Sequence, residues 1–149
     1  YVGLDRARDP RAARRHEGMM RGLSEAGLSL VAEAVAEFPT STHGGRRLLA
    51  ELLAREPGLD AVVFSNDDMA VGGLFHCLAA GIRPREELAL FGFNALEVGQ
   101  SLPMPLSTIR SRRDTIGRIA AKEILESPQR PAVHTIIDTG YEIVEGGTA

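Results

Sequence analysis

Short apolar runs alternate with stretches of helical periodicity over residues 1–100. The predicted strands are the apolar runs at residues 1–4, 30–38, 61–64 and 88–93. Between them, apolar residues recur at helical spacing and predict helices over residues 10–26, 41–56 and 66–80. Because strand and helix alternate, the pattern predicts an α/β fold: a Rossmann-like parallel sheet, wound right-handed, with flanking helices.

The segment from residue 60 to residue 81 organises this pattern, because a polar turn follows its strand directly. Ser65 is predicted to cap the next helix, with Asp68 three residues later as its reciprocal partner. Asn66 lies on the turn after the strand, which is where parallel sheets bind ligands. The alternative is that Asn66 only caps the helix. The adjacent carboxylates of Asp67 and Asp68 are expected to form a solvated cap and not an acid/base pair.

The first helix has a clear entry and two unusual glycines. Asp9 is predicted as its N-cap, with Pro10 at the first helical position and Gly27 as its end. Gly18 and Gly22 lie one turn apart and predict a close approach of this helix to the sheet, at some cost in helix propensity.

The rhythm changes after residue 101. Residues 102–105 contain two prolines and are predicted as a stiff extended connection, followed by a strand over residues 107–110. A Ser-x-x-Asp start at Ser111 then leads into another helix. The apolar residues predicted on the inward face of this helix are Ile116, Ile119, Ala120 and Ile124.

The two ends of the chain carry separate signals. Apolar runs at residues 134–137 and 141–144 predict a hairpin-like pair of strands joined around residues 138–140. Tyr1 opens in mid-strand without a methionine before it. The chain is therefore expected to be a piece of a longer protein.

Composition narrows the function classes. With 149 residues, 44% of them hydrophobic, the chain can bury one core or form one lobe of a larger protein. Its 17 basic and 20 acidic residues give a net charge of −3 without any basic run, so the chain by itself is a poor nucleic-acid binder. The single cysteine, Cys77, excludes an internal disulfide and fits a reducing, cytoplasmic compartment. No apolar run reaches membrane-spanning length.

Motifs of catalysis and cofactor binding are missing from the sequence. It contains no G-x-G-x-x-G, no G-x-x-x-x-G-K-[ST] and no G-x-S-x-G. None of its four histidines has an i,i+4 partner, or a cysteine or carboxylate neighbour at metal-ligand spacing. The sequence therefore predicts no catalytic residue, no metal site and no cofactor.

Four motifs in order resemble the lactose-repressor family of bacterial transcription regulators. Residues 65–72 (S-N-D-D-M-A-V-G) resemble the family's x-N-D-x-M-A-x-G segment, and residues 15–18 (R-H-E-G) resemble its R-x-x-G. Residues 90–94 (L-F-G-F-N) are similar to V-x-G-[FY]-D/N. Residues 105–120 are similar to the block P-x-L-T-T-I…I-G-x-x-A, with Ser107 where Thr is usual. Each motif alone is weak, but four in the right order make the resemblance strong over the whole chain.

The resemblance implies one lobe of a periplasmic-binding-protein-like type I fold plus the final part of the other lobe. In this family two Rossmann-like lobes are joined by three crossovers, and the ligand lies in the cleft between them. Residues 1–105 would form the C-terminal lobe, and residues 106–149 the crossover and the final segment of the N-terminal lobe. The DNA-binding domain, through which operator DNA would be bound, is absent from this chain.

The resemblance also implies which residues contact the effector. Arg15 matches a helix arginine that grips hydroxyl or carboxylate oxygens, and Asn66 matches an asparagine that binds a sugar diol. Asn94 stands where most sugar-binding members place an aspartate that accepts hydrogen bonds from hydroxyls. The alternative for Arg15 is a solvated helix face.

Further contacts are implied on two loops. Asp9 and Arg11 fall on a strand-to-helix loop that usually supplies effector contacts, and Thr40 is a looser match. Residues 9–11 and 92–100 are similar to the gluconate-operon branch of the family. Two arginines beside a neutral Asn94 favour a sugar acid such as gluconate over a neutral sugar, although Asp9 offsets one of the cations.

The function implied is that of a sugar- or sugar-acid-responsive repressor, acting as a binding switch without a chemical step. A homodimer is expected, with Val71, Leu74 and Phe75 at its interface. One alternative is a periplasmic sugar-binding protein of a transport system, which shares the fold. Another is a flavodoxin-like enzyme domain, against which the missing phosphate loop argues.

Overall fold

The computed structural model describes residues 1–7, 9–36, 39–126 and 136–149. Its strands are β1 (Val2–Leu4), β2 (Ala34–Ala36), β3 (Ala61–Val63), β4 (Ala89–Phe91), β5 (Thr108–Ser111) and β6 (Tyr141–Val144). Its helices are α1 (Pro10–Glu25), α2 (Thr42–Arg55), α3 (Asp67–Ala80), α4 (Glu97–Gln100) and α5 (Arg113–Glu126). The predicted α/β alternation is confirmed. Within the predicted run of residues 30–38, β2 is shorter than expected, and residues 37–38 lie outside the described residues.

Five strands join into a parallel sheet in the order β2-β1-β3-β4-β5. β1 pairs with β2 and β3 pairs with β4, both in parallel. Single parallel bridges, Val2 to Phe64 and Phe91 to Ser107, connect these pairs to each other and to β5. This is the doubly wound order of flavodoxin-like sheets, which bind ligands outside the carboxyl ends of the strands where the order reverses. Here the reversal lies between β1 and β3.

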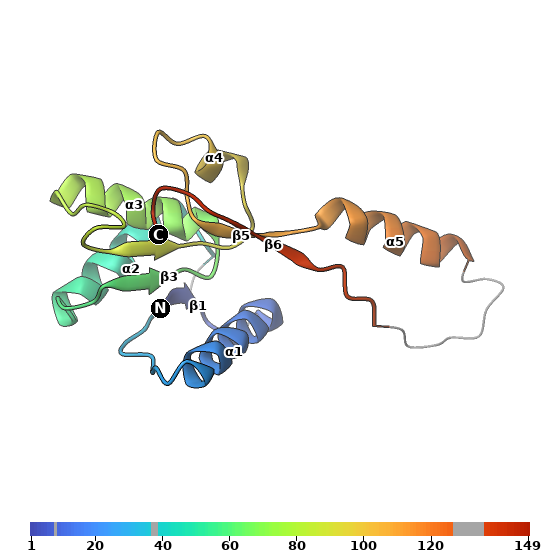
Figure 1. Ribbon diagram of the computed structural model, residues 1–149, viewed down its shortest axis with the longest axis horizontal. Coiled ribbons are helices and arrows are strands. Elements are labelled where there is room, and N and C mark those ends of the chain that lie inside the picture. Colours follow the sequence, from blue (N-terminus) through green and yellow to red (C-terminus); the bar gives the residue numbers. More distant parts are fainter. Residues whose placement is uncertain (8, 37–38, 127–135) are drawn as a thin grey trace.

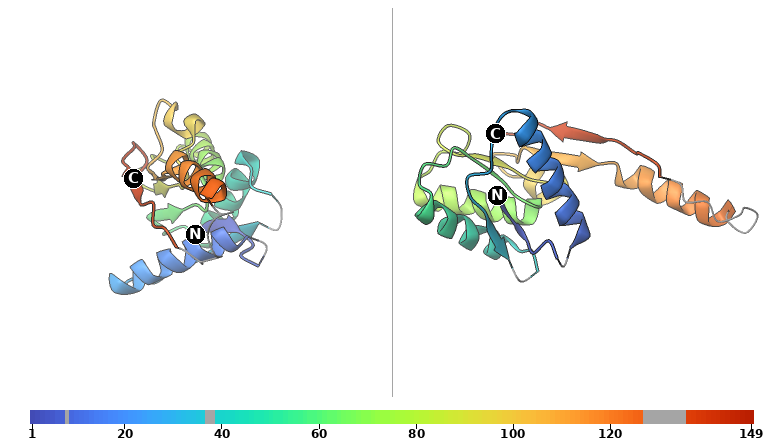
Figure 2. Two further views of the ribbon diagram at one scale, coloured as in Figure 1. Left: turned by 90° about the vertical axis from the view of Figure 1, so that its right-hand side faces the viewer. Right: turned by 90° about the horizontal axis from the view of Figure 1, so that it is seen from below.

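α2 and α3 cover one face of the sheet and pack against each other, while α1 lies on the other face (Figures 1 and 2). Two glycines permit the close packing of α2 and α3. A Cβ on Gly72 would collide with the carbonyl oxygen of Thr42, and a Cβ on Gly45 would collide with the backbone of Met69. The buried core between these helices and the sheet includes Leu48, Leu49, Leu52, Phe64, Leu74 and Leu90.

α1 lies farther from the sheet than predicted. Ala12 is its one fully buried residue in the described chain, and an added Cβ at Gly18 or Gly22 would meet no atom within 4 Å. Met19 and Leu23 instead line an apolar hollow of about 390 Å³ between the helix and the sheet. The predicted close approach at the two glycines is wrong, because these long side chains stand between helix and sheet.

β5 and β6 form an antiparallel ribbon that leaves the sheet and leads to α5 (Figure 1). Thr108 pairs with Val144 at the base of the ribbon, and Ser111 pairs with Tyr141 at its far end. The predicted pairing of residues 141–144 with residues 134–137 is corrected, because β6 takes β5 as its partner. Residues 134–135 lie outside the described residues, and residues 136–137 form no strand.

Most apolar residues of α5 are exposed to solvent. Ile116 is 45% exposed, Ile124 is 72% exposed, Ala120 is exposed and Ile119 is half-buried. The prediction that these residues face inward is wrong for this structure, because α5 projects away from the sheet and none of its residues is buried (Figure 1). Among the described helices, none has the length and apolar character needed to cross a bilayer.

Candidate ligand-binding site

The turn after β3 forms the centre of the candidate site. Asn66 is the N-cap of α3, with extended backbone and a side-chain Oδ1 that accepts a hydrogen bond from the Met69 N–H at 3.1 Å. Ser65 does not cap the helix as predicted, because the chain is still extended at Asn66 and the helix begins one residue later. Its hydroxyl contacts the Met69 sulfur at 3.5 Å instead.

Capping leaves part of the Asn66 side chain available. The cap uses only the amide oxygen, and no described residue accepts a hydrogen bond from the Nδ2 group. An asparagine amide carries two N–H donors there, besides a second lone pair on the oxygen. The capping role and the predicted ligand role of Asn66 are therefore compatible.

Arg15 is brought to this turn from α1. Its Nη1 donates to the Ser65 carbonyl oxygen at 3.0 Å, and its Cζ lies 4.0 Å from the centroid of the Phe93 ring. A guanidinium over an aromatic face at this distance is a cation–π contact. Burial lowers the pKa of Arg15, although Asp9 acts in the opposite direction. Only one of its five N–H groups has an acceptor among the described residues, so Arg15 is held in place with donors to spare.

The loop after β4 brings Asn94 to the same edge of the sheet. Asn94 and Ala95 have φ angles of 124° and 49°, and the Asn94 N–H donates to the Ile109 carbonyl oxygen at 2.9 Å. Asparagine and aspartate tolerate positive φ better than most residues. Asn94 therefore has a conformational role in this loop beside its predicted ligand role.

Asp67 departs furthest from the environment that the sequence predicts for it. Its side chain is fully buried, with Oδ2 accepting from the Leu96 N–H at 2.7 Å and Oδ1 accepting from the Thr108 hydroxyl at 2.7 Å. The predicted solvated cap is wrong for Asp67, because the loops after β4 and into β5 cover the first turn of α3. No local pattern in the sequence marks this burial. In the structure, a Cβ on Gly92 would collide with the Asp67 carboxylate, so the glycine leaves room for it.

Asp9 and Arg11 sit at the start of α1. Asp9 caps the helix as predicted, accepting from the N–H groups of Arg11 at 2.9 Å and Ala12 at 3.3 Å. Burial works to raise the pKa of Asp9, but these hydrogen bonds and the Arg11 guanidinium together leave it below its ordinary value. The Arg11 side chain is 81% exposed and lies 3.3 Å from the Asp9 carboxylate. Both charges are near enough to Arg15 to shift its pKa.

Thr40 is the one predicted ligand contact that the described part of the chain does not link to the turn after β3. It is half-buried and precedes Ser41, whose hydroxyl caps α2 by accepting from the Gly44 N–H at 3.0 Å. Thr40 makes no hydrogen bond to Arg15 or Asn66 among the residues that the structure describes. Its role as a ligand contact stays a prediction.

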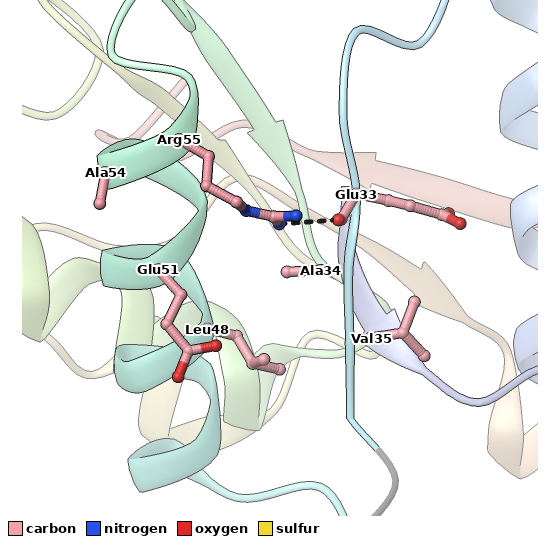
Figure 3. Close-up of a pocket in the computed structure, with 7 residues that line it drawn as sticks. All are labelled: Glu33, Ala34, Val35, Leu48, Glu51, Ala54 and Arg55. Atoms are coloured by element: carbon pink, nitrogen blue, oxygen red, sulfur yellow. Dashed lines mark hydrogen bonds between the residues drawn. The ribbon is translucent and has the colours of Figure 1, made fainter.

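A larger hollow of about 570 Å³ lies elsewhere, between β2 and α2 (Figure 3). It is lined by Glu33, Ala34, Val35, Leu48, Glu51, Ala54 and Arg55. Arg55 reaches across it and donates from Nη2 to the Glu33 carbonyl oxygen at 3.0 Å (Figure 3). It is open, lies at the β2 edge of the sheet and contains no predicted site residue. We therefore do not assign the ligand site there.

The predicted interface residues of α3 behave differently from one another. Val71 and Leu74 are each 2% exposed and belong to the core of this chain, whereas Phe75 is 42% exposed. Leu78, one turn further, is 60% exposed. The interface prediction is therefore corrected for Val71 and Leu74, because their surface is already covered by their own chain. It stays a prediction for Phe75.

The described residues offer no cluster of three or more His, Cys, Asp or Glu side chains that could hold a metal ion. Cys77 is buried on α3, and burial raises its thiol pKa to about 11. A thiol of such a pKa stays protonated near neutral pH and is a poor nucleophile.

A family model described as a periplasmic binding protein-like domain matches residues 1–149. The chain is 36% identical over 146 residues to the HTH-type transcriptional regulator GntR of Pseudomonas aeruginosa, covering 97% of this chain and 42% of that protein. The transcription regulator GntR from Chromobacterium violaceum has a crystal structure that matches with a TM-score of 0.88 at 30% identity, over 99% of this chain and 55% of that chain.

The lac repressor dimer matches with a TM-score of 0.87 at 21% identity, over 99% of this chain and 51% of that chain, which shows the shared fold alone. The chain thus spans less than two thirds of each of these relatives. The sequence motifs, the family model and the strand order all indicate the same periplasmic-binding-protein-like fold. The chain belongs to the periplasmic binding protein-like domain family, in the form that regulators of the lactose-repressor family carry.

Proposed function

We propose that this chain is the effector-binding and dimerisation part of a cytoplasmic transcription repressor, and that its effector is a sugar acid such as gluconate. The observation that carries the proposal is Arg15, held by Ser65 and Phe93 beside the Asn66 turn. This arrangement lies at the carboxyl edge of the parallel sheet, where such folds bind ligands.

The polar groups at the carboxyl edge of the sheet suit a ligand that carries a carboxylate and several hydroxyl groups. A guanidinium binds a carboxylate through two parallel hydrogen bonds, and the unbonded Nδ2 of Asn66 suits a hydroxyl group. Asp9 offsets Arg11 by their contact at 3.3 Å, which leaves the charge of Arg15 for a ligand. Asn94 adds no negative charge that would repel a carboxylate. The name GntR of two relatives agrees with the gluconate-operon branch to which the sequence motifs are similar.

The proposed mechanism is a switch in the orientation of two lobes. We assign residues 1–105 to the C-terminal lobe and residues 106–149 to the crossover and the final segment of the N-terminal lobe. The β5–β6 ribbon, which links the sheet to α5, would then cross between the lobes. Effector binding between the lobes changes their relative orientation. This change raises or lowers the affinity of a pair of DNA-binding domains, outside this chain, for operator DNA. The coupling between effector and DNA is about 1–3 kcal/mol in such systems.

Titration calorimetry on the full-length protein tests the ligand assignment. Gluconate should bind more tightly than glucose, and Arg15→Gln should weaken gluconate binding by at least about tenfold, the equivalent of a lost charged hydrogen bond. Arg14→Gln is the matched control, because Arg14 is an exposed neighbour on the same helix. Equal losses in both variants, or a preference of the parent protein for glucose, would contradict the sugar-acid assignment.

The regulatory assignment has its own test. The gene upstream of residue 1 should encode a helix-turn-helix segment, as expected for a repressor. A secretory signal peptide in that position would instead identify a periplasmic sugar-binding protein of a transport system.

A further inference from the structure

We propose that Asp67 is a positioning residue that sets the orientation of the β5–β6 ribbon relative to the ligand-binding turn. The inference rests on the proposed function, in which Asn66 contacts the effector and the ribbon crosses to the second lobe. Asp67 follows Asn66 directly in the chain, so a contact that shifts the turn also shifts this carboxylate.

The Asp67 side chain joins three segments at once. It belongs to the first turn of α3, its Oδ2 accepts from the Leu96 N–H in the loop after β4, and its Oδ1 accepts from the hydroxyl of Thr108, the first residue of β5. Both distances are 2.7 Å, and the residue has no exposed surface. Short hydrogen bonds to a buried carboxylate are strong, and the loss of either donor leaves the charge under-satisfied.

The loop that Asp67 holds is conformationally strained. Asn94 and Ala95 both have positive φ, which is uncommon for residues other than glycine and is costly for Ala95 in particular. The enforcing contacts are the Leu96 bond to Asp67, the bond from the Asp67 N–H to the Phe93 carbonyl oxygen at 3.0 Å, and the Asn94 bond to Ile109. The loop carrying Asn94 and the start of β5 therefore depend on the same carboxylate.

Thr108 completes the connection to the ribbon. Its hydroxyl donates to Asp67 and accepts from the Ala95 N–H at 3.5 Å, and its backbone pairs with Val144 of β6. The base of the ribbon is thus tied to the turn that carries Asn66. In the described chain this ribbon is the covalent path from the sheet to α5 (Figure 1). Its orientation at Thr108 decides where α5 lies.

Distance measurements between the sheet and α5 test this inference in the full-length protein. Cysteines replacing Glu86 and Glu123, both exposed, carry spin labels, while Cys77 is buried and stays unlabelled. Labelled protein is diluted into excess unlabelled protein, so that only distances within one subunit are read. The variants are Thr108→Val, which removes the hydroxyl, Thr108→Ser, which keeps it, and Asp67→Asn, which keeps the shape but not the charge.

The expected result has two parts. Without ligand, Thr108→Val and Asp67→Asn broaden the distance distribution, while Thr108→Ser keeps the parent distribution. With saturating gluconate, the parent protein and Thr108→Ser show a change in mean distance, and Thr108→Val loses at least half of it while binding gluconate within about threefold of the parent. Ser41→Ala, which removes the α2 cap without removing a hydrogen bond of Asp67 or Thr108, is the control for lost stability and should leave the distribution unchanged.

Parent-like distributions in Thr108→Val and Asp67→Asn would overturn the inference, as would equal broadening in Ser41→Ala. Failure of gluconate to bind the parent protein would count against the proposed function alone. In that event the ligand-free distributions still decide the role of Asp67.

Discussion

Two helices of this chain, α3 and α5, share an apolar periodicity and end in opposite environments. In α3 the apolar residues Val71, Leu74 and Cys77 are each at most 2% exposed. In α5 no residue is buried, and Ile124 is 72% exposed. Periodicity in the sequence therefore identifies the apolar face of a helix but not the part of the protein that covers it. α3 is covered because α2 and β3 precede it closely in the chain and β4 follows it closely, whereas the ribbon carries α5 away from the sheet and its helices.

Truncating an apolar side chain should cost far more stability in the buried core than on α5. Leu52→Ala should lower the free energy of unfolding of the 149-residue chain by about 2–5 kcal/mol, because it leaves a cavity in a fully buried site. Ile124→Ala should change it by less than about 0.5 kcal/mol, as at other exposed positions. Urea denaturation of the two variants measures both. A comparable loss in Ile124→Ala would show that α5 is covered in solution.

A second prediction tests whether the charge at position 94, at the carboxyl edge of the sheet, selects a sugar acid over a neutral sugar. Asn94→Asp places a carboxylate near the proposed sugar acid, and at about 5 Å with an effective dielectric near 20 the repulsion is roughly 3 kcal/mol. Sugar-acid affinity should fall by on the order of a hundredfold, with a much smaller loss for a neutral hexose. Asn94→Gly is the control, since glycine keeps the positive φ without a charge. Unchanged gluconate affinity in Asn94→Asp, measured by calorimetry on the intact effector domain, would refute the sugar-acid reading.

The third prediction separates the exposed part of α3 from its buried part. Phe75→Glu should weaken dimerisation of the full-length protein by at least about 1 kcal/mol, or roughly fivefold, if Phe75 lies at the interface. Met20→Glu places the same charge on an exposed apolar position of α1 and should leave the dimer intact. Sedimentation equilibrium compares the two. A Phe75→Glu variant as dimeric as the parent would remove this residue from the interface.

A small loss of stability is expected when the charge of Asp9, the N-cap of α1, is removed. The pKa of Asp9 is lowered in the folded chain. Its ionised carboxylate therefore stabilises the fold at pH values above the pKa of an unfolded aspartate, and this stabilisation is lost as the pH falls through the folded pKa. Asp9→Asn keeps a capping oxygen but loses the charge, so it should cost about 0.3–1 kcal/mol at pH 7. The difference between the variant and the parent should shrink at pH 3, as measured by urea denaturation at both pH values. A difference independent of pH would mean that the charge contributes nothing.

Much of the candidate site could be predicted from the sequence because its signals are local or belong to a known family. The Asp9 cap of α1 and the β3 turn follow from nearest neighbours in the chain, and the structure brings Arg15 to that turn as the family resemblance implies. The contact of Phe93 with Arg15 could not be predicted from the sequence, because it joins residues on different elements. No local pattern distinguishes a ring that packs under an arginine from one that fills a core.

The alternation of strands and helices, the parallel sheet and the family follow from the sequence alone, because apolar period, turn residues and motif order are properties of short segments. Three features appear only in the folded chain: Asp67 is buried while Asp68 is not, β6 pairs with β5, and α5 is left uncovered. Each of these depends on contacts between segments far apart in the chain, such as Asp67 with Thr108. Adjacent residues of one type are equivalent in the sequence, and the loops that fold over them make them different.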